Sequence, residues 1–333
     1  MLALVLSHMN SLYRASKRLL RTTLERHRLS EKEGSARRPA TIFSPASKTI
    51  SMVMPAYNEE NRMPSTLAET LNYLAQRRSR QGESFTYEII VVSDGSTDQT
   101  TKVAMDFADR IGYDTVRVLE LPRNMGKGAA VKQGVLAARG ELILMVDSDG
   151  ATAIEDVEKL EAEMARVLAS GASAGPAGAE TAVVERKHGM VVGSRAHLEG
   201  AALAKRSWYR NMLMHGFHLL VVLVAGHAIK DTQCGFKLFT RDAAAALFSN
   251  MKLQRWCFDV ELVHLAQRLH VPVREVAVNW TEIPGSKIRA TSMLNMAYEI
   301  GLLLLGYTIV GNWRPLKLPQ LLGESAPAGK KAQ

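Results

Sequence analysis

The chain has 333 residues, of which 47% are hydrophobic and 23% charged, and it carries a formal net charge of +9. These values are typical of a folded protein with a sizeable core and exclude wholesale disorder. The positive charge indicates an anionic partner, but no zinc-ligand spacing and no aromatic-basic alternation accompanies it, so no nucleic acid is expected. Only Cys234 and Cys257 occur, which excludes a disulfide framework and fits a reducing compartment.

Residues 1–48 are predicted to form a basic, membrane-associating segment and a linker. Between residues 1 and 28, apolar side chains recur loosely at helical spacing among arginines and lysines. An amphipathic helix on an anionic membrane explains this pattern, and a transit peptide or a solvated basic tail explains it equally well. The composition of Ser30–Lys48, rich in Ser, Ala, Pro and charge, is typical of a linker.

From Thr49 onward, short apolar runs alternate with helical patterns. Capping-box spacing at Thr66 and Glu69, and again at Thr152 and Glu155, predicts two helix starts. Such alternation predicts a parallel sheet covered by helices on both faces, with ligands at the carboxyl ends of the strands. The predicted strands are residues 49–55, 87–92, 116–121 and 141–146.

Three of the four predicted strands end in polar clusters: Pro55–Glu60, Ser93–Ser96 and Asp147-Ser148-Asp149. Aspartates at i and i+2 on an extended segment point the same way and offer two carboxylates to one Mg²⁺ or Mn²⁺. A cation held there would bridge nucleotide phosphates and neutralise a departing diphosphate. Turn-forming aspartates would need no metal, but three clusters at one sheet edge favour a site.

An apolar strand followed by Asp-x-Asp-Gly-x-Thr also resembles the nucleophile motif of haloacid-dehalogenase-type phosphatases. That family usually opens its core domain with this strand and needs a later strand ending in paired acids. Here three strand–helix units come first, and no such strand follows Gly150. The phosphatase is therefore a distant alternative.

A series of motifs between residues 49 and 290 resembles the dolichyl-phosphate β-glucosyltransferases, inverting enzymes of glycosyltransferase family 2. The motifs are "VMPAYNEENRMPSTL", "YEIIVVSDGSTDQT", "NMGKGAAVKQGVLAARG", "DSDGAT", "GSRAHLE", "DTQCGFKLFTRDAA", "FDVELVHLAQ" and "VNWTEIPGSKI". The first blocks mark the wider group, whereas "DTQCGFKLF" and "NWTEIPGSK" are more specific to polyprenyl-phosphate glycosyltransferases.

The resemblance implies an α/β fold of the GT-A type, with a nucleotide-sugar half at 49–195 and an acceptor half at 196–290. An apolar helix and a polar tail would follow at 291–333. The implied reaction is transfer of glucose from UDP-glucose to dolichyl phosphate, for protein N-glycosylation, on the cytosolic face of the endoplasmic reticulum membrane. GDP-mannose or another sugar nucleotide as donor is the alternative, and a non-catalytic nucleotide sensor is a third interpretation.

The resemblance also implies roles for individual residues. Asp94 would accept a hydrogen bond from the uracil, and Asp147 and Asp149 would hold the metal. Two departures from the family pattern are Ser93, where a second aspartate is usual, and Ser148, where a small residue such as alanine is frequent. The implied nucleotide-sugar residues are Pro55, Tyr57, Glu59, Asp94, Lys127, Asp147 and Ser148.

Cations and hydroxyls of the second half would form a pocket for the lipid phosphate if they converge. Taken alone, each is more typical of a solvated surface charge, so these positions rest mainly on the resemblance. A phosphate monoester is already largely anionic at neutral pH and needs no strong general base. Asp259 is therefore expected to be an orienting group. A catalytic role for Asp259, in addition to Asp147 and Asp149, stays open. The predicted acceptor residues are Arg195, Arg206, Gln233, Lys237, Ser286 and Lys287.

Two apolar stretches extend the membrane hypothesis. Asn211–Ile229 holds no Lys, Arg, Asp or Glu, and Met293–Trp313 is strongly apolar except for Glu299. We expect each to lie on the membrane surface and not to span it, with a buried core helix as the alternative for the first.

Overall fold

The structure is a computed structural model that describes residues 2–33, 40–172, 188–198, 221–222, 224, 226–227, 229–283 and 290–322. Seven strands form one sheet: β1 (Lys48–Ala56), β2 (Tyr87–Ser93), β3 (Val116–Glu120), β4 (Gly140–Met145), β5 (Met190–Ser194), β6 (Lys237–Thr240) and β7 (Val273–Ala277). Their order across the sheet is β3-β2-β1-β4-β6-β5-β7.

The first four strands are parallel, as predicted: β1 pairs with β2 and β4, and β2 pairs with β3. β6 was not predicted, and it runs antiparallel to both β4 and β5, while β7 is parallel to β5. Strands from both predicted halves therefore share one sheet.

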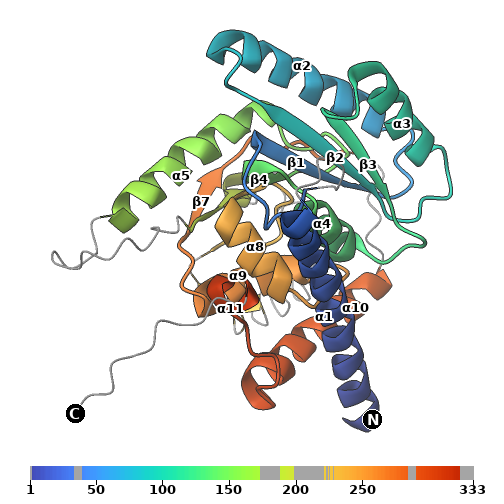
Figure 1. Ribbon diagram of the computed structural model, residues 1–333. Helices are drawn as coiled ribbons and strands as arrows, with labels where there is room; N and C mark the ends of the chain where they lie inside the picture. The colour runs from blue at the N-terminus through green and yellow to red at the C-terminus, as the bar shows by residue number, and fades with distance from the viewer. Residues whose placement is uncertain are drawn as a thin grey trace.

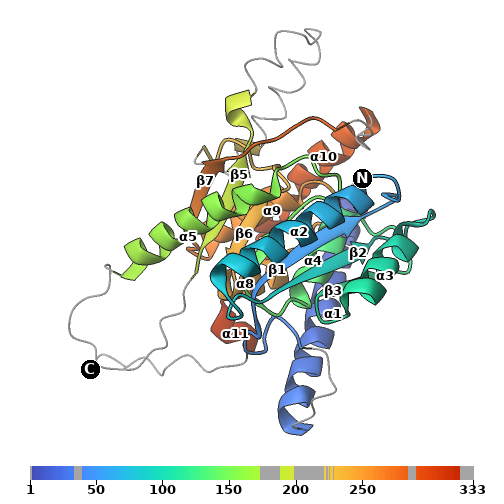
Figure 2. The same ribbon diagram turned by 90° about the horizontal axis from the view of Figure 1, so that it is seen from above.

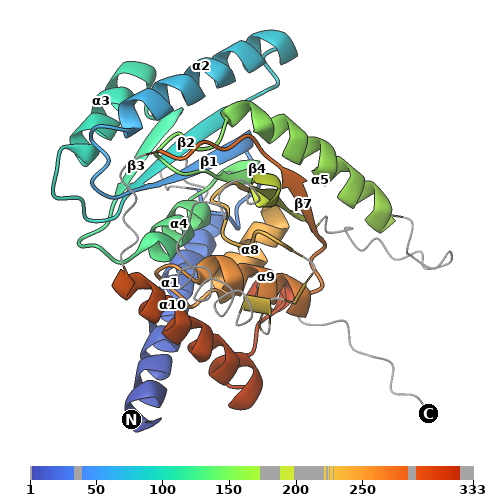
Figure 3. The same cartoon turned by 180° about the vertical axis from the view of Figure 1, so that it is seen from behind.

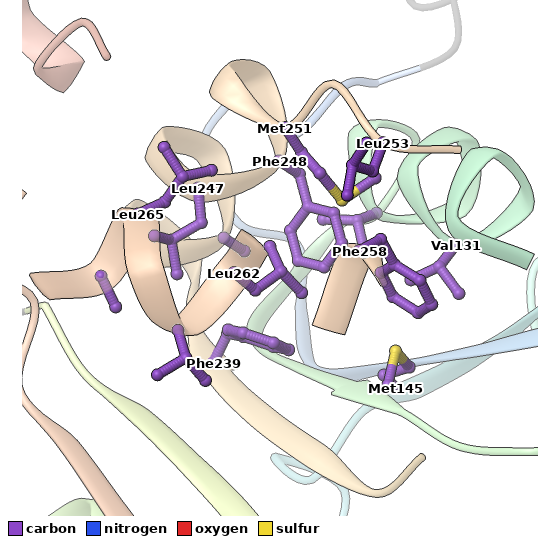
Figure 4. Close-up of a cluster of buried hydrophobic side chains, with 14 of the residues drawn as sticks. Val131, Met145, Phe239, Leu247, Phe248, Met251, Leu253, Phe258, Leu262 and Leu265 are labelled. Carbon is purple, nitrogen blue, oxygen red and sulfur yellow. The ribbon is translucent and has the colours of Figure 1, made fainter. Parts of the chain in front are cut away.

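Helices cover both faces of the sheet (Figures 1 and 2). One face carries α2 (Met63–Gln81), α3 (Thr100–Ile111) and α5 (Val157–Ala172); the other carries α4 (Lys127–Leu136), α8 (Arg241–Asn250) and α9 (Phe258–Arg268). Successive side chains along each strand point to opposite faces. Met52 and Met54 therefore belong to the first core, between the sheet and α2, α3 and α5, whereas Val53 belongs to the second core, on the face covered by α4, α8 and α9. Figure 4 shows part of the second core, where Met145 and Phe239 of the sheet lie beneath Phe258 and Leu262 of α9.

The two capping-box predictions were wrong. α2 begins at Met63, and Pro64 at its start favours that position because its fixed backbone angle suits a first helical turn. Thr66 is already inside the helix and donates to the Arg62 carbonyl. The 3₁₀ turn η1 (Ile154–Asp156), which precedes α5, has no side-chain cap either.

The N-terminal segment is a single helix, α1 (Leu2–Glu33), so the predicted helical spacing is confirmed, and Met9 and Ser16 are buried against the body. The prediction that residues 30–48 form a linker is only partly correct. Ser30–Glu33 is helical, and Arg241 fixes residues 41–44 by donating to the carbonyls of Thr41 and Ser44.

The C-terminal part consists of α10 (Ala290–Leu303), a π-helical segment η3 (Leu304–Ile309) and α11 (Leu318–Leu322). α10 lies beside α1 below the sheet (Figures 1 and 3), where the rings of His8 and Tyr298 are 5.9 Å apart. Within the described part of the chain, Ser292–Ile309 is the one stretch that is long and apolar enough to cross a membrane, judged by length and composition alone.

Candidate active site

The polar clusters predicted at the strand ends meet at one edge of the sheet. Tyr57–Glu60 follow β1, Asp94 follows β2, and Asp147–Asp149 follow β4. These three strands are neighbours in the order β2-β1-β4 and parallel, so their carboxyl ends lie together. Gly150 ends the motif with φ +74°, the left-handed conformation that allows the chain to turn sharply.

Asp147 forms an ion pair with Lys127, at the start of α4. The Lys127 Nζ lies 2.6 Å from the Asp147 Oδ1. Burial alone would raise the pKa of Asp147, but Lys127, with Lys237 and Arg195 farther away, outweighs burial and holds that pKa below its ordinary value. Asp147 is therefore an anion whose charge is compensated by a lysine.

Asp149 is less well compensated. Burial and the negative charge of Asp147 raise its pKa, although the Ala151 N–H donates to its Oδ1 at 3.1 Å. Arg62 lies farther off, with its Nη1 4.0 Å from the Asp149 Oδ2, and its Nη2 donates to the Glu59 Oε1 at 2.6 Å. Arg62 thus connects the turn after β1 with the turn after β4.

A second ion pair, which is buried, lies behind Asp147. The Lys237 Nζ is 2.5 Å from the Asp259 Oδ1 and also donates to the Cys234 carbonyl. Lys237 is fully buried (0% exposed), so the predicted contact with a lipid phosphate would require this pair to open. Burial raises the pKa of Asp259, against the effect of Lys237 and Lys127.

Gly235 packs directly on the Asp147 carboxylate. A Cβ on Gly235 would overlap that carboxylate, so no other residue fits without displacing it. The motif "DTQCGFKLF" therefore contributes a backbone wall to the site.

Arg195, at the end of β5, is held from two sides. Its Nε and Nη2 donate to the Asp231 carboxylate at 2.8 and 3.0 Å, and its guanidinium lies 5.4 Å from the Trp280 ring centre. The side chain keeps about a third of its surface exposed. Gln233 lies in the turn after Asp231 and is partly buried. The predicted residues Arg206, Ser286 and Lys287 lie outside the described residues.

A cleft of about 690 Å³ adjoins Asp94. Tyr57, Ser96 and Asn124 are among its lining residues. The Asp94 carboxylate accepts from the backbone N–H groups of Met125 and Gly126 at 2.7 and 2.8 Å, which fixes the loop that forms one wall. Burial nevertheless raises the pKa of Asp94.

Two other predicted residues, Pro55 and Ser148, and the departure at Ser93 lie along this edge of the sheet. Pro55 belongs to β1, Ser148 is buried, and the Ser93 hydroxyl bonds to those of Ser96 and Thr101. A larger cleft of about 950 Å³ lies between α2 and the start of α5, but no predicted site residue lines it.

The donor set fits a hard divalent cation. Two neighbouring carboxylates whose repulsion raises the pKa of Asp149 would be stabilised by such an ion. Among the described residues, no group of three or more Asp, Glu, His or Cys side chains could hold a metal alone. Further ligands would therefore come from substrate phosphates or water, as is usual for Mg²⁺.

The sequence is similar to known proteins over most of its length. The sequence model described as "Glycosyl transferase family 2" matches residues 51–248. The chain is 48% identical over 275 residues to the dolichyl-phosphate beta-glucosyltransferase of Mus musculus, covering 82% of this chain and 80% of the mouse protein. The chain belongs to glycosyl transferase family 2, among the dolichyl-phosphate beta-glucosyltransferases.

The Saccharomyces cerevisiae member of these glucosyltransferases is 36% identical over 273 residues, which cover 80% of this chain and 77% of the yeast protein. A solved structure, glucosyl-3-phosphoglycerate synthase from Mycobacterium tuberculosis, has a TM-score of 0.44 and 18% identity, covering 78% of this chain and 79% of that chain. Family 2 membership and the mixed sheet confirm the predicted glycosyltransferase fold and enzyme class, and they decide against a phosphatase.

Sequence reasoning did not single out Arg62, Asp231 or Gly235 as site residues. All three lie inside or beside motifs that carry the resemblance, but the partners of Asp231 and Gly235 are remote in the chain. Arg62 pairs locally with Glu59, whereas Asp231 and Gly235 contact Arg195 and Asp147.

Proposed function

We propose that the enzyme transfers glucose from UDP-glucose to dolichyl phosphate with inversion, giving dolichyl β-D-glucosyl phosphate and UDP. The names of the mouse and yeast relatives support both the sugar and the acceptor. The observation that carries the proposal is the meeting of Asp94, Asp147 and Lys127 at one edge of the parallel sheet.

In this proposal the uridine occupies the cleft beside Asp94. The carboxylate retains lone pairs beyond those used by Met125 and Gly126, and one would accept the uracil N–H. Tyr57 would supply an aromatic wall, and Glu59, fixed by Arg62, would hold the ribose side. GDP-mannose is the alternative donor.

Asp147 and Asp149 would hold Mg²⁺ or Mn²⁺, with Ser148 between them. Such a cation, when bound, would neutralise charge on the leaving diphosphate. Lys127 lies against Asp147 and would offer its ammonium to the same phosphates as negative charge develops there. The preformed carboxylate–lysine geometry needs no rearrangement of the strand end.

Arg195 would position the acceptor phosphate, since its guanidinium is oriented by Asp231 and remains partly exposed. A phosphate oxygen of the acceptor forms a bond to the anomeric carbon while the bond from that carbon to the diphosphate breaks. The electron pair of the broken bond leaves with UDP. Asp259 would hold Lys237 in place behind the reacting groups and would remove no proton.

The acceptor is a lipid, and we propose that α1 and α10 hold the enzyme at the cytosolic face of the endoplasmic reticulum membrane. Leu4 on α1 and Leu294 on α10 are 77% and 75% exposed, unlike typical core residues. Exposed basic residues follow on α1, including Arg14 and Arg18, and would contact anionic headgroups. The product would then be a lipid-linked donor for protein N-glycosylation.

The test is transfer from radiolabelled UDP-glucose to dolichyl phosphate, with and without a chelator, and with GDP-mannose in parallel. We expect metal-dependent glucolipid, absent in Asp149→Ala. Asp114→Asn is the matched control, because Asp114 is an exposed carboxylate paired with Lys48 and Arg139 and is not part of the strand-end site. Formation of mannolipid instead would show that the donor is GDP-mannose and not UDP-glucose. If folded protein gave no lipid product from either donor, the proposed reaction would be wrong. Retention on membranes after alkaline carbonate would argue for integration instead of surface attachment.

A further inference from the structure

Glu299 is the only charged residue in the apolar stretch 293–313, and the proposed reaction does not use it. Its side chain is turned into the protein and is only 8% exposed. A buried carboxylate is costly unless hydrogen bonds compensate it. Its partners therefore indicate what the residue does.

Glu299 holds the end of the loop between α8 and α9, residues 251–257, which we call the α8–α9 loop. Its Oε2 accepts from the backbone N–H groups of Cys257 and Trp256 at 2.9 and 3.2 Å. Cys257 immediately precedes α9 and makes no side-chain cap of its own. Since the first N–H groups of a helix lack partners within the helix, α10 supplies the acceptor for the start of α9.

The same loop contacts the first turn of α4. The Gly128 N–H donates to the Arg255 carbonyl at 3.2 Å, and the Ala129 N–H donates to the Gln254 carbonyl at 2.9 Å. A Cβ on Gly126 would lie 2.5 Å from the Gln254 oxygen. The loop and the start of α4 therefore touch through backbone, without space for adjustment.

Both ion pairs of the active site include a residue next to these contacts. Lys127, which pairs with Asp147, lies between Gly126 and Gly128. Asp259, which pairs with Lys237, lies in the first turn of α9, two residues after Cys257. A shift of the α8–α9 loop would consequently displace one partner of each pair.

The start of the loop is held from α1 and η3. Ser16 of α1 donates to the Met251 carbonyl at 2.9 Å, and Glu261 accepts from the Leu253 N–H at 2.7 Å and from the Tyr307 hydroxyl at 2.6 Å. Met251 and Leu253 also pack over Phe258 (Figure 4). The loop thus lies between the candidate membrane helices and the active site.

We propose that Glu299 is a positioning residue for glucosyl transfer: by fixing the end of the α8–α9 loop, it aligns Lys127 on Asp147. The proposal rests on the proposed function, because the reaction it aligns is the one proposed above. Glu299 bonds to the loop and not to Lys127 or Asp147, so its effect on them passes through backbone groups of residues 254–257.

The experiment compares Glu299→Ala, Glu299→Gln and Leu302→Ala in the full-length, detergent-solubilised protein. Leu302 is a buried residue of the same helix, so its truncation weakens α10 packing while leaving the Glu299 carboxylate. Amide hydrogen exchange is followed in peptides covering Trp256–Cys257 and Gly126–Ala129. In parallel, kcat and KM for UDP-glucose are measured with dolichyl phosphate.

For Glu299→Ala we expect amide exchange to become about tenfold faster in both peptides, with kcat about tenfold lower, as for one lost buried hydrogen-bond acceptor. KM should change less than about threefold, since the lost alignment serves the transition state. Glu299→Gln keeps a carbonyl oxygen, so its amide exchange rates and its kcat should be close to those of wild type. Leu302→Ala should lower the unfolding temperature and leave the amide exchange rates and kcat near those of wild type.

Two results would overturn the proposal. Faster exchange confined to Trp256–Cys257, with normal kcat, would show that the contact does not reach Lys127. Equal losses of kcat in Leu302→Ala and Glu299→Ala would show a general structural role. An inactive wild-type protein would instead overturn the proposed function, and exchange at Gly126–Ala129 would still decide whether Glu299 controls the start of α4.

Discussion

The Lys127 ammonium lies 2.6 Å from the Asp147 carboxylate, although Lys127 begins a helix and Asp147 follows a strand. Asp149, two residues farther on, has a raised pKa because of burial and the charge of Asp147. The two aspartates of one short motif are thus electrostatically different: Asp147 is paired with a lysine at 2.6 Å, whereas Arg62 lies 4.0 Å from Asp149.

Replacing Lys127 by methionine should reduce kcat/KM by about 100- to 1,000-fold, the range for loss of one preorganised charge on a developing anion. Without this lysine the pKa of Asp147 should rise, because Lys127 is the main group that opposes the effect of burial. The acid limb of the pH–activity profile should therefore move to higher pH. Steady-state kinetics across pH would measure both effects. Lys102→Met, on the exposed side of α3, should leave the profile unchanged.

Asp149→Asn should abolish activity and yet leave the metal-free protein at least as stable as wild type. The substitution removes a carboxylate whose ionised form is opposed by burial and by Asp147. Thermal unfolding with UDP and increasing Mn²⁺ measures the consequence. Wild type should gain about 2.7 kcal/mol at a hundredfold excess over Kd, and the variant should gain far less. A variant stabilised as much as wild type would place the metal elsewhere.

The parallel strands and the carboxylates at their ends were predictable from the sequence because both depend on local pattern. A strand buried on two faces is a continuous apolar run, and parallel topology alone brings Asp94 and Asp147 to one edge. The helix starts were less predictable. The capping-box spacing predicts that α2 begins at Thr66, but the helix begins three residues earlier, at Met63. The fixed backbone angle of Pro64 favours this earlier start over a side-chain cap at Thr66.

The surroundings of the carboxylates could not be predicted because they depend on contacts between remote segments. Gly235 is 88 residues from Asp147 in the chain, and only the fold shows that its hydrogen faces that carboxylate. The burial of Lys237 likewise follows from its pairing with Asp259 on α9. A sequence pattern identifies a lysine but not whether an aspartate of another element already neutralises it.

Gly235→Ala should inactivate the enzyme without unfolding it. The new methyl group would overlap the Asp147 carboxylate, so Asp147 must turn away from its position beside Lys127. We expect at least about a hundredfold loss of kcat/KM, comparable to the loss of the charge itself, with a far-UV circular dichroism spectrum like that of wild type. Gly301→Ala is the control: its methyl group meets nothing within 4 Å, and alanine favours a helix interior by up to about 1 kcal/mol. Near-normal activity of Gly235→Ala would mean that Asp147 can function from another position.

Lys132 should make the protein more stable as the pH rises from 7 to 8.5. Burial, and then the charge of Lys252, lower the pKa of Lys132 from 10.5 to about 7, so in the folded protein it loses its proton over this range. The unfolded chain remains protonated, and unfolding therefore takes up a proton. The free energy of unfolding should rise with pH, by up to about 2 kcal/mol from this residue. Lys252, with a pKa lowered to about 8, acts in the same direction.

Urea unfolding followed by tryptophan fluorescence at pH 7.0 and 8.5 measures this rise. Lys132→Met should show a smaller one, because its side chain does not titrate. The Met251 carbonyl keeps Ser16 as a donor in this variant, so a buried acceptor is not left without a partner. Lys102→Met should keep the wild-type dependence, since Lys102 is exposed. A pH dependence unchanged by Lys132→Met would mean that Lys132 is charged in the folded protein and that another group is responsible.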